Sequence, residues 1–215
     1  MLQEVGSPLD PNDVTVVVAM PSEEKPMRRL VPQLRLVCAG MGLGSLTESL
    51  DTAVVLSVGL AGGLEPELRS GTVVIPGEVG LEDGTLLPCD AAWSAALERA
   101  SLRLGFPTVT SPLLSADALV THDGRAAWFH KGFSAVDMET GLLAGMVARV
   151  AAVRVILDTP SHEQSAVWER PERAVVNPRQ WLEAAWIMRS VPRYCRRAAL
   201  VVAAALADAK VTSHG

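Results

Sequence analysis

The sequence VTVVVAM, Val14–Met20, is the first long apolar stretch of the chain. β-branched residues dominate it, and charged residues are absent from it. A continuous run of this kind is typical of a strand that is buried on both faces. Such strands belong to sheets that are covered by helices on both sides, so the stretch predicts an α/β protein.

Further apolar runs alternate with segments of helical pattern along the rest of the chain. The expected strands are Leu34–Gly40, Thr52–Gly59, Gly71–Gly80, Phe133–Val136 and Val153–Leu157, and the second of these opens into a glycine-rich turn, GLAGGL. The expected helices are a short one that follows the strand ending at Gly40 and extends through Leu50, then Cys89–Gly105, Gly124–Gly132, Glu139–Ala151, and Asn177–Ala209 with a break at Pro192. We therefore predict one α/β domain over residues 14–210, with a mixed central β-sheet flanked by helices on both faces, and a flexible lead-in over residues 1–13.

The composition excludes several classes of function. The chain has 215 residues, 19 basic and 24 acidic, and a net charge of −5. It lacks a basic block, so we expect no nucleic-acid partner. The three cysteines, Cys38, Cys89 and Cys195, are far apart, and no His or Cys spacing indicates a metal site. No apolar run approaches the ~20 residues that span a bilayer. We expect a cytoplasmic protein without a transmembrane segment.

Carboxylates stand where the most buried strands end. The segment AVDMETG, Ala135–Gly141, carries Asp137 and Glu139 directly after a strand, and RVILDTP, Arg154–Pro160, carries Asp158. Glu23 follows the first strand in the same way. Because ligands of open α/β sheets bind at the carboxyl ends of the strands, Glu23, Glu139 and Asp158 are candidates for one shared site.

These segments also carry a family resemblance. AMPSEE, AGMG, SVGLAGGLEPELRSGTVVIP, SADALV, VDMETG and VRVILD occur in this order between about Val14 and Asp158. Together they resemble the nucleoside phosphorylase/nucleosidase superfamily, which includes purine nucleoside phosphorylases and methylthioadenosine/S-adenosylhomocysteine nucleosidases. The C-terminal segment and the glycine motif are most similar to the branch associated with hopanoid biosynthesis, which acts on adenosylhopane. The resemblance implies a nucleoside phosphorylase-like fold.

The resemblance also implies roles for the acids. Asp158 would protonate the departing purine, and Glu139, with Met138 beside it, would bind the ribose hydroxyls. Glu23 would activate the attacking water. Two carboxylates on opposite sides of the sugar would resemble the inverting arrangement of glycosidases. The alternatives are that Asp158 only begins a turn, and that Glu139 and Glu23 only favour helix N-termini.

The resemblance places the base and the nucleophile at glycine-rich and apolar segments. Leu119, Val120, Ala61 and Gly62 would bind the base, and the backbone at Gly40, Gly42 and Gly59 would form an anion or water loop. Two departures stand out, because Leu157 occupies the position of a family serine and Leu119 that of an aromatic residue.

We predict an enzyme that cleaves the N-glycosidic bond of a purine nucleoside, with adenine as the expected base and no cofactor or metal, although phosphate could be a co-substrate. Water is favoured as the nucleophile, because Glu23 and Ser57 stand where phosphorylases have arginines. The alternatives are a methylthioadenosine/S-adenosylhomocysteine nucleosidase, a catalytically weak nucleoside-binding protein, and a structural protein that uses its alanine-rich C-terminal helix. The apolar character of that helix predicts that it is buried in a core or in a subunit interface, and we expect a homo-oligomer.

Overall fold

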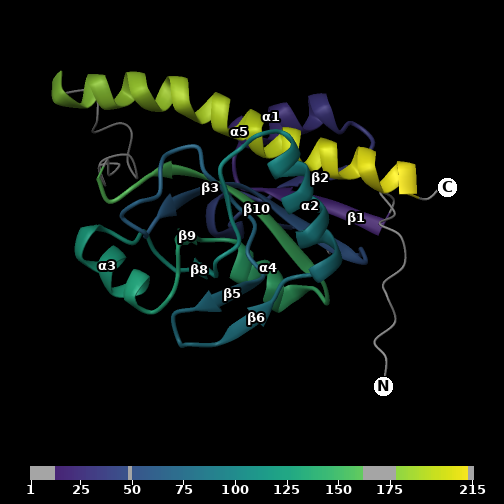
Figure 1. The fold of residues 1–215 in the computed structure, drawn as a ribbon, viewed down its shortest axis with the longest axis horizontal. Coiled ribbons are helices and arrows are strands. Elements are labelled where there is room, and N and C mark those ends of the chain that lie inside the picture. The colour runs from purple at the N-terminus through teal and green to yellow at the C-terminus, as the bar shows by residue number, and fades with distance from the viewer. Residues whose placement is uncertain (1–12, 48–49, 162–177, 213–215) are drawn as a thin grey trace.

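The structure is a computed structural model, and it describes residues 13–47, 50–161 and 178–212. Strands and helices alternate along the chain, with the central strands packed between helices (Figure 1). The strands are β1 (Val14–Val18), β2 (Arg35–Cys38), β3 (Val54–Gly63), β4 (Val73–Val74), β5 (Glu78–Leu81), β6 (Leu86–Pro88), β7 (Thr108–Val109), β8 (Leu113–Ser115), β9 (Ala135–Asp137) and β10 (Val150–Asp158). The helices are α1 (Pro21–Leu30), the 3-10 turn η2 (Met41–Leu43), α2 (Ala91–Arg103), α3 (His122–His130), α4 (Thr140–Met146) and α5 (Pro178–Thr212).

The strands of the described residues form one mixed sheet that branches at β3. One path through the sheet has the order β6-β5-β8-β9-β3-β10-β4-β7. A second path adds β1, which pairs with the first half of β3, and then β2, which pairs with β1. The branch arises because β3 is long: its first residues pair with β1, whereas Gly62 and Gly63 pair with β9. The predicted mixed sheet is confirmed, and β3 becomes the strand that all parts of the site share.

The two longest strands, β3 and β10, run parallel in the centre. Their register pairs Val150 with Val55 at one end and Asp158 with Gly62 at the other. Every residue of β10 is buried. A central strand without an exposed face is rigid, so β10 fixes the position of its terminal carboxylate.

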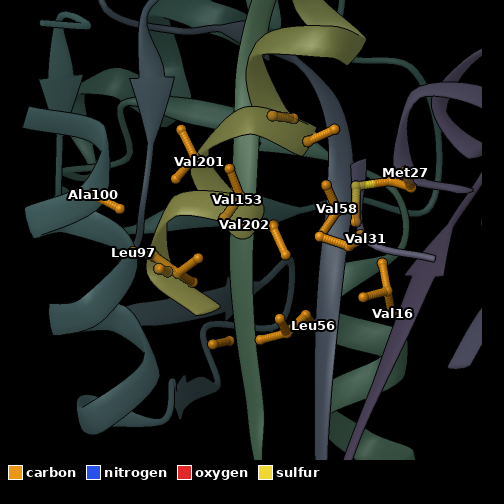
Figure 2. Close-up of a cluster of buried hydrophobic side chains, with 14 of the residues drawn as sticks. Val16, Met27, Val31, Leu56, Val58, Leu97, Ala100, Val153, Val201 and Val202 are labelled. Carbon is orange, nitrogen blue, oxygen red and sulfur yellow. The ribbon is translucent and has the colours of Figure 1, made fainter. Parts of the chain in front are cut away.

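Helices cover both faces of the sheet, as predicted. On one face, α1, α2 and α5 pack on β1, β3 and β10 through a large apolar cluster (Figure 2). Val58 and Val153 of the sheet meet Val201 and Val202 of α5 in this cluster. On the other face, Leu143 of α4 packs against the sheet in a separate cluster. None of the helices in the described part of the chain is long and apolar enough to cross a membrane.

The structure corrects the prediction for the glycine-rich segment. GLAGGL is not a turn: Gly59–Gly63 continue β3, because this segment pairs with β10 and, at its end, with β9. The predicted strand Gly71–Gly80 is instead two short strands, β4 and β5, separated around Pro76, whose missing N–H interrupts sheet pairing. The prediction also missed β6, β7 and β8, which are too short to show the alternation of apolar and polar residues that is typical of a strand.

Three helix predictions were also wrong in extent. The helix expected to reach Leu50 is only the 3-10 turn η2, which begins after Gly40, a residue with a φ of 75°. Helix α4 ends at Met146 rather than Ala151, because pairing with β3 begins at Val150. Pro192 does not break α5, since buried side chains from Tyr194 onward hold the helix against the sheet. Asn177, the expected first residue of this helix, lies outside the described residues.

Candidate active site

A cavity opens at the carboxyl ends of β1, β3 and β10, and its volume is about 190 Å³. Acids, arginines and apolar side chains line it together: Glu23, Asp137, Glu139, Asp158, Arg125, Arg154, Ala19, Met20, Met41, Leu60, Ala61, Gly62, Leu119, Val120, Val136, Met138 and Leu157. A concave, largely apolar surface with a few converging charged groups is the usual form of a small-molecule site.

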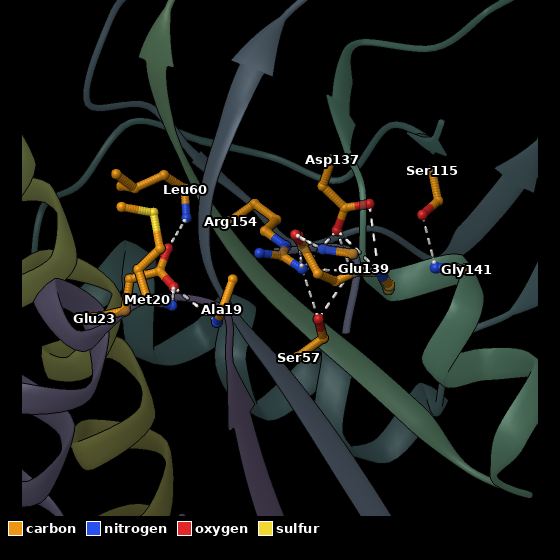
Figure 3. A network of polar contacts seen from close by, with 12 residues as sticks. Ala19, Met20, Glu23, Ser57, Leu60, Ser115, Asp137, Glu139, Gly141 and Arg154 are labelled. Atoms are coloured by element: carbon orange, nitrogen blue, oxygen red, sulfur yellow. Dashed lines mark hydrogen bonds and ion pairs between the residues drawn. The ribbon is translucent and has the colours of Figure 1, made fainter. Parts of the chain in front are cut away.

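Glu23 lies in the first turn of α1 and folds back onto the end of β1 (Figure 3). Its Oε2 accepts hydrogen bonds from the N–H groups of Ala19 and Met20, both at 2.9 Å, and its Oε1 accepts one from the N–H of Leu60 at 3.0 Å. Burial raises the pKa of Glu23, and the charge of Arg154 and the three N–H groups oppose that rise only in part. A rigid carboxylate with a raised pKa is suited to take a proton from water.

Arg154 is the central cation of the site, although sequence analysis did not single it out. Its Nη2 lies 2.6 Å from Asp137 Oδ2 and 3.5 Å from Glu139 Oε2, and it donates to Ser57 Oγ at 2.7 Å and to Thr140 Oγ1 at 3.0 Å (Figure 3). Burial alone lowers the pKa of the Arg154 guanidinium, but the nearby carboxylates raise it overall. The sequence did contain a sign of this role, because Arg154 stands inside an otherwise apolar strand. A charged side chain in such a strand is buried only together with partners of opposite charge.

Glu139 follows β9 and connects two distant parts of the site. Its Oε1 accepts a hydrogen bond from the N–H of Gly42 at 3.1 Å, while its other oxygen faces Arg154. Its residue exposure is only 8%. Met138, its neighbour in the chain, also lines the cavity. The carboxylate is therefore held from two sides, as a group that accepts hydrogen bonds from a sugar would need to be.

Gly59 provides the space in which the acid and the arginine approach each other. A Cβ atom at this position would lie 2.6 Å from Glu23 Oε1 and 2.6 Å from Arg154 Nη1. Any side chain here would displace one of these groups. The missing side chain of Gly59 therefore lets Glu23 and Arg154 approach the backbone of a strand, and the glycine does not form a turn.

Asp158, at the end of β10, is paired with an arginine that sequence analysis missed. Arg125 of α3 places Nη2 2.5 Å from Asp158 Oδ2, with both side chains buried. The same guanidinium donates from Nη1 to the carbonyl of Gly63 at 2.9 Å and from Nε to the carbonyl of Val120 at 3.2 Å. The sequence predicted that Asp158 protonates the departing purine, and the structure places the guanidinium of Arg125 beside this carboxylate.

The structure brings most of the predicted site residues to this one cavity. Asp158, Glu23, Glu139, Met138, Leu119, Val120, Ala61 and Gly62 all line it. Gly40, Gly42 and Gly59 are not among the lining residues, although Gly42 and Gly59 contact the acids that are. Arg125, Arg154, Asp137, Met20 and Met41 are lining residues that were not predicted as site residues.

The cysteines do not form part of this cavity. All three are free thiols, and burial raises the pKa of Cys89 and of Cys195 to about 12, so both are protonated at neutral pH. Among the residues that the structure describes, no group of three or more His, Cys, Asp or Glu side chains is placed to hold a metal ion. The charged side chains that line the cavity are four acids and two arginines.

The sequence was also compared with known protein families. Residues 9–177 match the family described as the phosphorylase superfamily. The chain belongs to the phosphorylase superfamily. The resemblance that rested on six short motifs is thus confirmed at the level of the superfamily, and the match covers the strands and acids of the cavity.

Several solved structures are similar in fold to this chain. The chain is similar to a futalosine hydrolase mutant of Helicobacter pylori, with a TM-score of 0.70 and 13% identity over 92% of this chain and 99% of that one. It is also similar to the 5′-methylthioadenosine/S-adenosylhomocysteine nucleosidase of Neisseria meningitidis in complex with methylthio-immucillin-A, with a TM-score of 0.70 and 17% identity over 90% and 97% of the two chains. The corresponding enzyme of Campylobacter jejuni gives 0.69 and 13% over 91% and 98%. At these identities the likeness establishes the phosphorylase-type fold.

Proposed function

We propose that this protein hydrolyses the N-glycosidic bond of a purine nucleoside, with adenine as the leaving base. The observation that carries the proposal is the convergence of Glu23, Glu139 and Asp158 from three different strand ends on one cavity. Such cleavage needs a general base that deprotonates water, a group that binds the ribose hydroxyls, and a group that protonates the departing purine. The nucleosidase names of the similar structures favour the same class of reaction.

The proposed reaction assigns one step to each acid. Glu23 takes a proton from water as the water oxygen bonds to C1′ of the sugar. Glu139 accepts hydrogen bonds from ribose hydroxyls, and its negative charge stabilises the cation that develops on the sugar. The electron pair of the breaking C1′–N9 bond moves into the purine, whose ring nitrogen N7 receives a proton from Asp158. This reaction would need neither an organic cofactor nor a metal ion.

Water is the proposed nucleophile because, in the described part of the chain, the arginines near Glu23 are either engaged with acids or lie outside the cavity. The arginine nearest to Glu23 in the cavity, Arg154, is engaged with Asp137 and Glu139. Arg28 is exposed and pairs with Glu24 at 2.5 Å, and neither it nor Arg29 is a lining residue. A carboxylate at the position of attack repels phosphate but can activate water.

Apolar side chains at the cavity support a substrate with an apolar 5′ substituent. Met20, Met41 and Leu119 line the cavity and are nevertheless 37%, 66% and 42% exposed. Exposed apolar groups at a site mark where an apolar part of a ligand can be buried. Adenosylhopane is the leading candidate for the substrate, and methylthioadenosine is the second.

We also propose that the protein is cytoplasmic and forms a homo-oligomer.

The test is a panel of purine nucleosides incubated with purified protein, with and without phosphate, followed by chromatography of the bases and sugars. We expect free adenine and a free sugar at rates that do not depend on phosphate. Strict dependence on phosphate would replace hydrolysis by phosphorolysis. Tight binding of a nucleoside without turnover would favour the alternative of a nucleoside-binding protein.

A further inference from the structure

A second cavity lies between α1 and α5, two helices that pack side by side on one face of the sheet (Figure 1). Its volume is about 530 Å³, against about 190 Å³ for the candidate active site. The residues that line it are Ser22, Lys25, Pro26, Arg29, Leu30, Pro192 and Arg196. We call this cavity the α1–α5 groove. The proposed hydrolysis uses none of these residues.

Among the described residues, three cations and no acid line the α1–α5 groove. Lys25 and Arg29 come from α1 and Arg196 comes from α5, and all three side chains are exposed. In the part of the chain that the structure describes, none of the three forms an ion pair, whereas the neighbouring Arg28 pairs with Glu24 at 2.5 Å. In a protein with a net charge of −5, the groove is therefore a local concentration of uncompensated positive charge.

The cations of the groove also stand at positions where like charges repel. Lys25 and Arg29 are four positions apart on α1, and like charges at this spacing destabilise a helix. Arg193 and Arg197 repeat the spacing on α5 and line a neighbouring cavity that also reaches Arg196. Burial and, after it, the charge of Arg193 lower the pKa of Arg197. A bound anion would relieve this repulsion.

The walls of the groove are apolar and rigid. Pro26 and Pro192 each lie inside one of the two helices that form the groove, and Leu30 adds an apolar side chain. A proline in a helix interior removes a helix hydrogen bond and is destabilising there. Two elements that break the same local rule at one place indicate that the place has a function.

We propose that the α1–α5 groove binds an organic phosphate, which is a phosphate group carried by a partly apolar molecule. The guanidinium groups of Arg29 and Arg196 can each donate two parallel hydrogen bonds to phosphate oxygens. Lys25 supplies a third positive charge, and the hydroxyl of Ser22 is a further donor. Three cations match the charge of a phosphate dianion, and the prolines and Leu30 provide a surface for the apolar part of the ligand.

The α1–α5 groove is distinct from the site of the proposed hydrolysis. Of the residues that the structure describes, none lines both cavities. A phosphate held in the groove thus contacts different side chains from those that would hold a nucleoside. Binding of phosphate to the protein therefore does not by itself favour phosphorolysis, and the proposal for the groove is independent of the proposed function.

The test measures the binding of phenyl phosphate to the purified full chain by calorimetry, with inorganic phosphate for comparison. The wild type should bind phenyl phosphate at one saturable site, and more tightly than inorganic phosphate because of the apolar walls. Arg29→Gln and Arg196→Gln should each weaken the binding by about tenfold or more, since each removes hydrogen bonds between charged groups. Because these side chains are exposed, both variants should fold, and thermal unfolding checks this.

Arg28→Gln is the matched control for Arg29→Gln. It removes the same charge from the adjacent position of α1, and Arg28 is not a lining residue of the groove. The control should change the affinity by less than about twofold, because an exposed charge outside the site is screened by solvent and salt. Equal weakening in Arg28→Gln and Arg29→Gln would show a diffuse attraction and overturn the proposal.

Three further results would also overturn the proposal. One is the absence of saturable binding of phenyl phosphate. Another is unchanged binding in Arg29→Gln and Arg196→Gln, which would place the phosphate elsewhere on the protein. The third is equal affinity of the wild type for phenyl phosphate and inorganic phosphate, which would remove the role of the apolar walls.

Vesicles of phosphatidylcholine with and without phosphatidic acid distinguish the two sources of such a phosphate. Binding only to vesicles with phosphatidic acid, weakened in Arg29→Gln and reversed by phenyl phosphate, would support the proposal with a lipid headgroup as the ligand. Binding of phenyl phosphate together with no binding to either kind of vesicle would support it with a soluble organic phosphate. Equal binding to both kinds of vesicle, unaffected by phenyl phosphate, would contradict recognition of the headgroup phosphate.

Discussion

The N–H of Gly42 donates a hydrogen bond to Oε1 of Glu139 at 3.1 Å, although the two residues are 97 positions apart in the sequence. The contact joins the turn after β2 to the acid after β9. The turn thus holds one oxygen of the Glu139 carboxylate, and the other oxygen lies 3.5 Å from Arg154 Nη2. This arrangement leads to a prediction for the handling of ribose.

Glu139→Gln should lower kcat/KM for a ribonucleoside by about tenfold to a hundredfold, because hydrogen bonds to a charged acceptor contribute about 1.5–3 kcal/mol. The loss should be smaller for the 2′-deoxy substrate, which already lacks one hydroxyl. Steady-state kinetics on both substrates measures the difference. The exposed Glu82→Gln serves as a control, and equal losses on both substrates would leave Glu139 only a role at the start of α4.

Gly59→Ala should lower kcat by about 10²-fold or more, because its Cβ atom would displace Glu23 or Arg154 from their positions. Gly77→Ala is the matched control, since a Cβ atom there would meet nothing within 4 Å. Kinetics together with thermal unfolding would separate a displaced site from a destabilised fold. Wild-type rates in a folded Gly59→Ala protein would contradict the proposed role of Glu23.

Arg154→Met should destabilise the protein by about 3–5 kcal/mol, because it leaves the carboxylate of Asp137, which is 0% exposed, without its cation. Arg103→Met removes a surface pair with Asp208, whose side chains are 54% and 36% exposed, and should cost at most about 1 kcal/mol. Urea unfolding of both variants measures the comparison. Similar losses for the two would show that the buried network contributes no more than a surface pair.

The rate should also fall at low pH, because Glu23 must be ionised to act as a base. Burial raises the pKa of Glu23 above its ordinary value of 4.5, so the ionised fraction is lost as pH falls through that raised pKa. The ascending limb of kcat should therefore lie above pH 4.5, and it should disappear from whatever activity Glu23→Gln retains. An ascending limb that persists unchanged in Glu23→Gln would assign the proton to another group.

The sequence predicted the sheet well because the central strands are β-branched runs buried on both faces. It failed where tertiary contacts override local signals. The glycines of Gly59–Gly63 indicate a turn locally, yet they lie in β3 because pairing with β10 and β9 continues there. Pro192 lies within α5 because packing against the sheet outweighs the cost of a proline in a helix.

The acids of the site could be predicted because each lies at or shortly after the end of a buried strand, and the topology brings those strand ends together. Arg154 was detectable in principle as a charge within an apolar strand. Arg125 was not, because its role depends on how α3 places it beside Asp158, the carbonyl of Gly63 and the carbonyl of Val120. Such a long-range pairing has no local sequence signal.

The most direct test of the proposed function is the release of base from a purine nucleoside by the wild-type protein and by Asp158→Asn, each in phosphate-free buffer. The wild type should release free adenine and unphosphorylated sugar, and the variant should be slower by about 10²-fold or more while remaining folded, since a general acid contributes about 10²–10⁴-fold. Wild-type protein that releases no base from any nucleoside of the panel, or a variant with unchanged turnover, would contradict the account.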